Sequence, residues 1–287
     1  MALLHLWNSS GKLRIGITIL VVLGIMAVLK DVLFDLLVSK DVEPLDQGKF
    51  QVFLDPSRDH LLGTDRYGRD VFGLVLVGLP NSLAVAAIAG GISTLIGVVV
   101  GFVSGYMGGW VDAVLRTITD MFLVIPLLPL IFILTKYTSS LSIPTLGLII
   151  AIFGWPFGAR VIRSQVLSLR ERPYVELSKV TNLSSRQIIF GDILPNMLPY
   201  IGMSLALSAS GAAFALVALT VVGLGPSDTI DLGAIIFFAQ TWGVLSLGKW
   251  AILLAPMILL ALFFLSTALI NQGLEEVYNP RLRGASQ

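Results

Sequence analysis

The chain has 287 residues, of which 55% are apolar and only 13% are charged, and its formal net charge is +1. Soluble domains carry about 25% charged residues, so this composition, with a mean hydropathy of +0.88, excludes an ordinary soluble fold and predicts an all-α polytopic membrane protein. Cysteine is absent and histidine occurs only at His5 and His60, which excludes disulfides and thiol chemistry and disfavours a metal or catalytic centre.

Six apolar stretches are long enough to form transmembrane helices. They lie at about residues 13–37, 82–103, 113–134, 145–161, 197–222 and 250–270. No cleavable signal peptide is expected, because no small-residue cleavage pattern follows the long first stretch. We predict three regions: a tail and first helix at residues 1–38, an extracytoplasmic loop at 39–80, and a five-helix core at 81–287. A second long loop, 223–249, has an apolar middle that favours a re-entrant or interfacial helix.

Several polar and small residues lie within these stretches. Asp112, Arg116 and Asp120 recur every four residues, which predicts a ladder of ion pairs on one helix face, with an ion or proton pathway as the less favoured alternative. Small residues of the second stretch should let neighbouring helices approach closely; they are Gly90, Gly91, Gly97 and Gly101. The fifth stretch is rich in small and polar residues, among them Ser204, Ser208, Ser210 and Gly211. Its serines are predicted either to line a polar path or to pack at a helix interface. Gln240 in the second long loop is a further candidate for the path.

The polar segment at residues 170–196 lies between two apolar stretches and cannot itself be in the membrane. Its pattern predicts two short amphipathic helices that meet at a break. Asn182 tolerates the left-handed conformation that ends a helix, and Ser184 or Ser185 can cap the next one. A helix pair that projects from the membrane needs a partner to cover its apolar face, so we interpret the segment as a docking surface.

Charge asymmetry predicts the orientation of the chain, since short cytoplasmic loops carry an excess of Lys and Arg. Basic residues dominate around the polar segment, whereas acidic residues dominate between residues 30 and 80. The docking segment and both termini are therefore expected to be cytoplasmic, and the two long loops to face outward. No basic cluster with interleaved aromatic residues indicates nucleic-acid binding. The sequence also has no phosphate-binding P-loop, so energy from ATP must come through another subunit.

Four motifs carry a resemblance to a known family. The sequence RERPYVELSKVTNLSSRQIIFGDILPNMLP resembles the EAA loop of ABC importer permeases, with Glu176 at the family's Glu and Leu194 and Pro195 at its closing Leu-Pro. The segments HLLGTDRYGRD, GYMGGWVDAVLR and ARVIRSQVLSLRERPYVE resemble C-type permease subunits of the dipeptide/oligopeptide/nickel subfamily. The likeness covers roughly residues 14–283, with the motifs in the correct order.

The chain departs from the family pattern at four positions. Leu177 and Ser178 replace Ala-Ala, which preserves the helix but changes its packing on a partner. Asn182 stands where the family has Gly, and the turn should survive because Asn tolerates the same conformation. Asp192 occupies a position where many relatives have a basic residue or His, which puts any specific contact there in doubt.

The resemblance implies a type I ABC importer permease fold. It further implies two permease subunits, two ATPase subunits that hold ATP and Mg²⁺, an extracytoplasmic solute-binding protein and a prokaryotic cytoplasmic membrane with its lipid. This chain is then not an enzyme by itself and holds no cofactor or metal. The residues implied to couple transport to ATP hydrolysis are Glu176, Leu177, Ser178, Lys179, Asn182 and Leu183. A surface pair of Glu176 with Lys179 is the simpler alternative for the carboxylate.

The outer loops at residues 60–73 and 223–249 would face the partner permease or the binding protein; the GTDRYGRD stretch could instead cap the second helix. Oligopeptides and oligosaccharides both suit the subfamily, with nickel or another small solute as the alternative. A stand-alone secondary transporter is the rival from another class. It is disfavoured because no predicted span holds a lone buried carboxylate.

Overall fold

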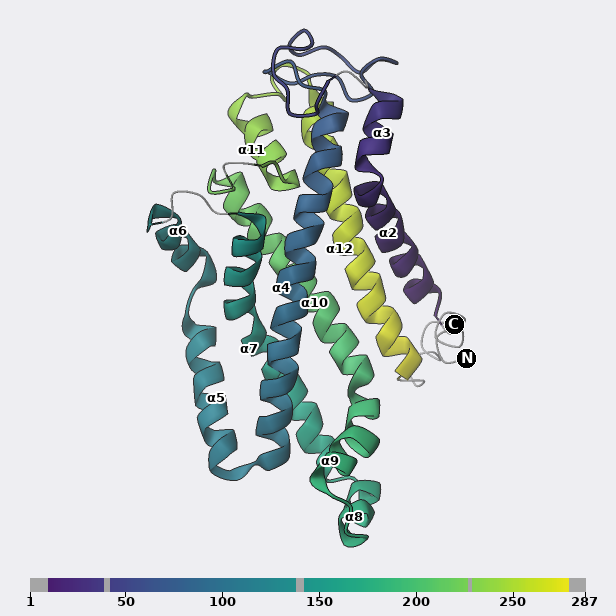
Figure 1. The fold of residues 1–287 in the computed structure, drawn as a ribbon, viewed down its shortest axis with the longest axis vertical. Coiled ribbons are helices and arrows are strands. Elements are labelled where there is room, and N and C mark those ends of the chain that lie inside the picture. The colour runs from purple at the N-terminus through teal and green to yellow at the C-terminus, as the bar shows by residue number, and fades with distance from the viewer. Residues whose placement is uncertain (1–9, 39–41, 138–141, 227–228, 279–287) are drawn as a thin grey trace.

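The computed structural model describes residues 10–38, 42–137, 142–226 and 229–278, and these residues form helices joined by loops, without a strand among them (Figure 1). The elements in chain order are α2 (Gly11–Val28), α3 (Lys30–Leu37), α4 (Val71–Met107), α5 (Gly109–Val124), α6 (Leu127–Tyr137), α7 (Ile143–Arg170), α8 (Pro173–Val180), α9 (Ser185–Gln187), the π-helix η1 (Ile188–Ile193), α10 (Leu194–Val221), α11 (Leu232–Thr241) and α12 (Trp250–Tyr278).

The helices agree with the predicted six spans. In the described part of the chain, five helices are long and apolar enough to cross a membrane, and α5 with α6 makes a sixth span if this bent pair is counted as one. The pair bends by 70°. Ile125 at the break is extended, because the residue before a proline is disfavoured in the helical conformation, and Pro126 follows it. Pro126 thus interrupts the third span.

The second and fourth predicted spans are longer than expected. The second begins at Val71 rather than at residue 82, so the predicted end of the outer loop at residue 80 falls inside α4. The first turns of α4 are apolar and buried, with Val71 and Leu74 in the core. Hydropathy alone did not distinguish these turns from the preceding loop. The fourth span extends through Arg170 instead of ending at residue 161.

Helix α4 is the centre of the bundle and contacts α2, α7, α10, α11 and α12. Its closest neighbour is α7. Three glycines at four-residue spacing, Gly97, Gly101 and Gly105, face the α7 backbone, and a Cβ built on Gly101 would lie 2.7 Å from the carbonyl oxygen of Ala159. The predicted role of small residues is therefore confirmed for this face. It is wrong for Gly91, which has no neighbour within 4 Å.

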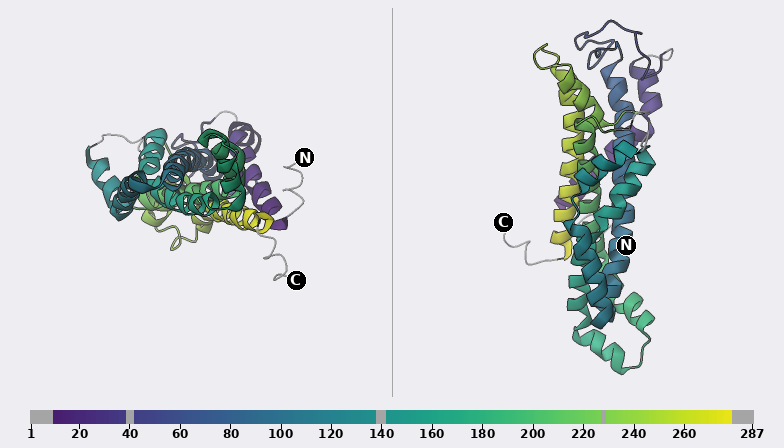
Figure 2. Two further views of the ribbon diagram at one scale, coloured as in Figure 1. Left: turned by 90° about the horizontal axis from the view of Figure 1, so that it is seen from below. Right: turned by 90° about the vertical axis from the view of Figure 1, so that its left-hand side faces the viewer.

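The start of α2 and the end of α12 lie at the same end of the bundle. Lys12 Nζ is 2.6 Å from Glu276 Oε1, and the Ser10 hydroxyl donates a 2.8 Å hydrogen bond to the other oxygen of that carboxylate. The helices themselves approach closely, because Gly16 on α2 faces the Ser266 carbonyl on α12. Figure 1 shows the two helices running side by side, and the left view of Figure 2, from below, shows their ends next to each other.

The loop at residues 42–70 and α11 lie at one end of the molecule, and α8 lies at the opposite end (Figure 1). Side chains of α4 fix the approach to α11. Asn81 Nδ2 donates to the Ile230 carbonyl at 2.6 Å, and the Leu232 N–H donates to Ser82 Oγ at 3.0 Å. The apolar stretch in the second long loop is helical, as predicted, but α11 is too short to span a membrane.

Candidate functional site

Residues 170–196, here called the coupling segment, contain α8, a tight turn, α9 and η1. The turn is built as the sequence predicts. Asn182 has φ of 57°, and the Leu183 N–H donates to the Ser178 carbonyl at 3.1 Å. This bond across the left-handed residue is that of a Schellman motif, which ends α8 and redirects the chain.

The next helix begins with a complete capping box. Ser184 Oγ accepts from the Gln187 N–H, and Gln187 Oε1 accepts from the Ser184 N–H at 2.9 Å. Ser184, and not Ser185, is therefore the cap. Together the turn and the cap fix the angle between α8 and the helix that follows.

One face of α8 is anchored in the protein and the other is exposed. Val175 is fully buried and packs in one cluster with Ile188, Ile193 and Met197. Opposite it, large apolar side chains are exposed at the tip of the molecule: Tyr174, Leu177, Val180 and Leu183, with Leu177 at 65% and Val180 at 79% of full exposure. We call these four residues the apolar tip. An exposed apolar patch on a rigid base is typical of a surface that a partner covers.

The described polar side chains of the predicted coupling set are either exposed or hydrogen-bonded within α8 itself. Glu176 lies in the first turn of α8 and is exposed, where a carboxylate is favoured by the helix dipole. The Ser178 hydroxyl donates to the Tyr174 carbonyl at 3.1 Å. The side chain of Lys179 lies outside the described residues, so its predicted pair with Glu176 stays a prediction.

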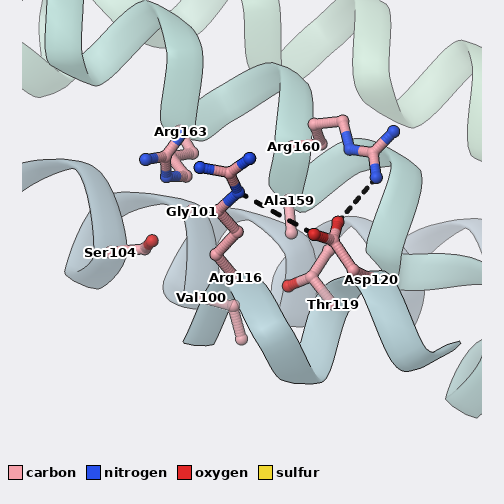
Figure 3. A pocket seen from close by; sticks show the side chains of 9 residues that line it. All are labelled: Val100, Gly101, Ser104, Arg116, Thr119, Asp120, Ala159, Arg160 and Arg163. Atoms are coloured by element: carbon pink, nitrogen blue, oxygen red, sulfur yellow. Dashed lines mark hydrogen bonds and ion pairs between the residues drawn. The ribbon is translucent and has the colours of Figure 1, made fainter. Parts of the chain in front are cut away.

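A cluster of charges joins α5 to α7 beside a cavity of about 390 Å³ (Figure 3). Asp120 lies between two arginines, 2.7 Å from Arg160 and 3.8 Å from Arg116. Asp112 instead binds Arg163 of α7 through both oxygens, each at 2.5 Å. The predicted ladder along α5 is therefore wrong for Asp112, whose partner is on another helix. The cluster ties α5 to the core.

A second cavity, of about 520 Å³, lies between α7, α10 and α12. It is lined along α10 at helical spacing by Tyr200, Met203, Ser204, Leu207, Ser208 and Gly211. Two of the four residues predicted for a polar path thus face it. Ser210 does not, because its hydroxyl is 2.7 Å from Thr267 Oγ1 on α12, and Gln240 is exposed on α11. On α10, Ser204 and Ser208 therefore face the cavity and Ser210 packs at the interface with α12.

The GTDRYGRD stretch caps α4. Asp70 Oδ1 accepts from the Gly73 N–H at 3.0 Å, and Asp70 Oδ2 is 2.8 Å from His60 Nδ1. Asp65 is fully buried and pairs with Arg69 at 2.6 Å. The guanidinium of Arg69 is 5.8 Å from the ring of Phe238 on α11. Of the two interpretations of this stretch, the structural cap is the one that the geometry supports.

The comparison with known families decides the class of the chain. A family model described as binding-protein-dependent transport system inner membrane component matches residues 97–284. The chain belongs to this family. It is the membrane-spanning permease subunit of a binding-protein-dependent transport system, located in the inner membrane, and we refer to it below as the permease.

Relatives of the permease are similar over most of its length. It is 34% identical over 231 residues to the oligopeptide transport system permease protein OppC of Mycobacterium tuberculosis, covering 79% of this chain and 78% of that protein. It is 32% identical over 238 residues to the dipeptide transport system permease protein DppC of Bacillus subtilis, covering 80% and 71%. The resemblance read from the motifs is thereby confirmed.

The fold is also that of a solved ABC transporter. An inward-facing structure of the MetNI methionine ABC transporter aligns with a TM-score of 0.53 at 19% identity, covering 68% of the permease and 94% of the solved chain. At this identity the likeness shows the fold alone. It agrees with the expected type I ABC importer permease fold.

Four polar residues of the second cavity were missed by the sequence analysis. Ser93, Tyr200, Asn271 and Glu275 line it. The last predicted span ended at residue 270, whereas α12 of the permease continues to Tyr278 and carries Asn271 and Glu275 one turn apart. Their four-residue spacing, in a stretch without proline, was the available signal that the helix continues.

Proposed function

We propose that the permease forms half of the translocation path of an ATP-driven importer for oligopeptides. A second permease of similar fold provides the other half, two ATPase subunits supply the energy, and an extracytoplasmic solute-binding protein delivers the peptide. The names of the relatives, oligopeptide and dipeptide permeases, favour peptides over oligosaccharides or nickel as the substrate.

The apolar tip is the observation that carries the coupling role. Burying a leucine or valine side chain stabilises a complex by about 1.5–3 kcal/mol, so Leu177 and Val180 offer a substantial gain to an ATPase groove that covers them. Val175 holds α8 to the bundle, so force on the tip reaches α7 and α10 directly. Exposed Glu176 adds a charge-assisted contact with a basic or amide donor of the partner.

Charge supports a cytoplasmic location for the coupling segment. Between residues 160 and 192 the basic residues are Arg160, Arg163, Arg170, Arg172, Lys179 and Arg186, against the acids Glu171, Glu176 and Asp192. The described ends of α2 and α12 lie together at one end of the bundle. By the positive-inside rule both termini are then cytoplasmic, and α11 and the outer loop face the binding protein.

In this proposal the helix bundle switches between two states. ATP binding draws the ATPase subunits together, the coupling segment moves with them, and the bundle passes between inward-facing and outward-facing states. Only a difference in binding between the two states can drive such a change. The cavity lined by Ser204 and Ser208 is the proposed segment of the path within this subunit.

The first test is to purify the tagged permease in mild detergent and identify its partners. The proposal expects a second permease, P-loop ATPases and a lipid-anchored binding protein. A chain that purifies alone and moves solute alone in liposomes would make it a secondary transporter. In the assembled complex, Leu177→Asp should lower the affinity of the ATPase subunits at least tenfold, whereas Arg172→Gln, an exposed change in the same segment, should not.

A further inference from the structure

The second cavity has its carboxylate, amide and phenol groups at one end. Tyr200, Asn271 and Glu275 lie toward the coupling segment, where α12 meets the start of α10; a Cβ built on Gly202 there would lie 3.0 Å from Leu274 Cδ1. The far end is lined by apolar residues, Leu127, Ile150 and Ala212. The walls between them are also largely apolar, with Phe157, Val161, Met203 and Leu207.

Glu275 is the one charged side chain among the described residues that line this cavity. Its neighbour Glu276 points to another helix, since it binds Lys12 at 2.6 Å and accepts from Ser10 at 2.8 Å. Consecutive residues on a helix point about 100° apart, so the two carboxylates have separate environments. Asn271, one turn before Glu275, places an amide on the same face.

An oligopeptide importer meets ligands whose side chains vary. The groups that all its ligands share are the backbone and the two charged ends. Apolar walls with scattered hydroxyl groups accept varied side chains, and a volume of about 520 Å³ is in the ordinary range of ligand pockets, about 300–1,000 Å³. A single carboxylate at one end can select only for positive charge.

We propose that Glu275, assisted by Asn271, receives the N-terminal ammonium group of the peptide as it passes through this subunit. This inference rests on the proposed function and names the chemical group that the path recognises. The ammonium donates to a carboxylate oxygen of Glu275, and the Asn271 side-chain carbonyl accepts a second of its three protons. No basic residue lines the cavity in the described part of the chain, so the C-terminal carboxylate of the peptide has no matching group here.

The test is uptake by the whole complex, with its ATPases, partner permease and binding protein, in liposomes. The probes are trialanine, its C-terminal amide and its N-acetyl form. Glu275→Gln should lower uptake of trialanine and its amide about tenfold relative to wild type, corresponding to about 1.4 kcal/mol. Uptake of N-acetyl-trialanine should be unchanged, and Glu275→Asp should restore part of the loss. Glu276→Gln is the matched control and should affect the three probes equally.

A second measurement uses the absence of cysteine from the chain. Glu275→Cys introduces a single thiol into the chain. The whole complex is treated with a methanethiosulfonate reagent, and modification of this thiol is then measured on the permease chain after it has been separated from its partners. Trialanine with ATP and loaded binding protein should slow the reaction at position 275 and leave it unchanged in Glu276→Cys.

Equal losses for the three probes, or no protection at position 275, would overturn the role of Glu275 and leave the peptide importer intact. A wild-type complex that takes up none of the three probes overturns the proposed function itself.

Discussion

Asp112 on α5 and Arg163 on α7 lie 51 residues apart and meet as a two-pronged ion pair, with Nε and Nη2 of the arginine each 2.5 Å from a carboxylate oxygen. Ser104 on α4 donates a hydrogen bond to the same carboxylate. Three helices are thus joined at one carboxylate, near the end of the bundle that carries the coupling segment. Helix α5 has few other buried side chains, with Thr119 the one in its described length.

Removing one partner of this pair should loosen α5. Asp112→Ala leaves a half-buried guanidinium without its anion, and a hydrogen bond to a charged group contributes about 1.5–3 kcal/mol. We expect the free energy of unfolding in mixed micelles to fall by about that amount. Arg116→Gln is the control, because its pair with Asp120 is exposed and 3.8 Å long, and it should change the free energy by under about 1 kcal/mol. Equal effects of the two substitutions would contradict the proposed tether.

The contact between α4 and α7 gives a second prediction. A Cβ on Gly101 would lie 2.7 Å from the Ala159 carbonyl oxygen and 2.9 Å from Ile162 Cβ, so Gly101→Ala must separate the two helices. Overpacking of this kind destabilises by about 1–3 kcal/mol. Gly91→Ala makes no contact within 4 Å and should be neutral or slightly stabilising. Micelle unfolding of the two variants measures the difference, and similar values would rule out close packing at Gly101.

The turn at Asn182 should be required for coupling. Proline fixes φ near −65°, which is incompatible with the observed 57°, so Asn182→Pro should abolish the turn while the spans still insert. We expect ATP hydrolysis to continue without uptake in the reconstituted complex. Asn182→Gly is the matched control and should keep uptake near the wild-type level, because glycine adopts positive φ freely. Wild-type uptake in the proline variant would remove the coupling role.

Glu176 offers a separate test of docking. Glu176→Gln removes the charge of an exposed side chain but keeps its shape, so the permease alone should be as stable as the wild type. If the carboxylate binds a cationic or amide donor of the ATPase, its affinity should fall by about 1.5–3 kcal/mol, and uptake with it. The binding of purified ATPase subunits to the permease measures this directly. An unchanged affinity would leave Glu176 as a surface residue.

Burial of Asp231 predicts a pH dependence at the opposite end of the protein. Asp231 is the N-cap of α11 and is fully buried, and this burial raises its pKa to about 6, despite hydrogen bonds from the Gly233 and Ala234 N–H groups. An aspartate pKa above its usual value of about 3.9 means that the folded state binds the proton more tightly than the unfolded state. The contribution of Asp231 to stability is therefore largest at low pH and is lost as the pH rises through about 6.

The measurement compares wild type with Asp231→Asn between pH 4 and pH 8. The amide keeps an oxygen for the cap but carries no charge, so the stability of the wild type relative to this variant should fall as the pH rises. A difference in stability that is independent of pH would show that burial does not raise the pKa of Asp231 in the folded protein.

Features that depend only on residues close together in the chain could be predicted from the sequence. Hydropathy depends on composition within a window, so the six apolar stretches were found from residues alone, although their ends were placed wrongly at Val71 and Arg170. The turn at Asn182 and the cap at Ser184 involve neighbours within five residues, so backbone preferences were enough to predict the turn and to restrict the cap to Ser184 or Ser185.

Only the tertiary structure decided which residues face one another. Whether Asp112 meets Arg116 on its own helix or Arg163 on another depends on how α5 packs against α7. The rotation of α10 turns Ser204 and Ser208 into the cavity and Ser210 toward α12. The continuation of α12 past residue 270 brings Glu275 into the same cavity. These relations are set by contacts between residues far apart in the chain, and the hydropathy and spacing within each stretch carry no information about them.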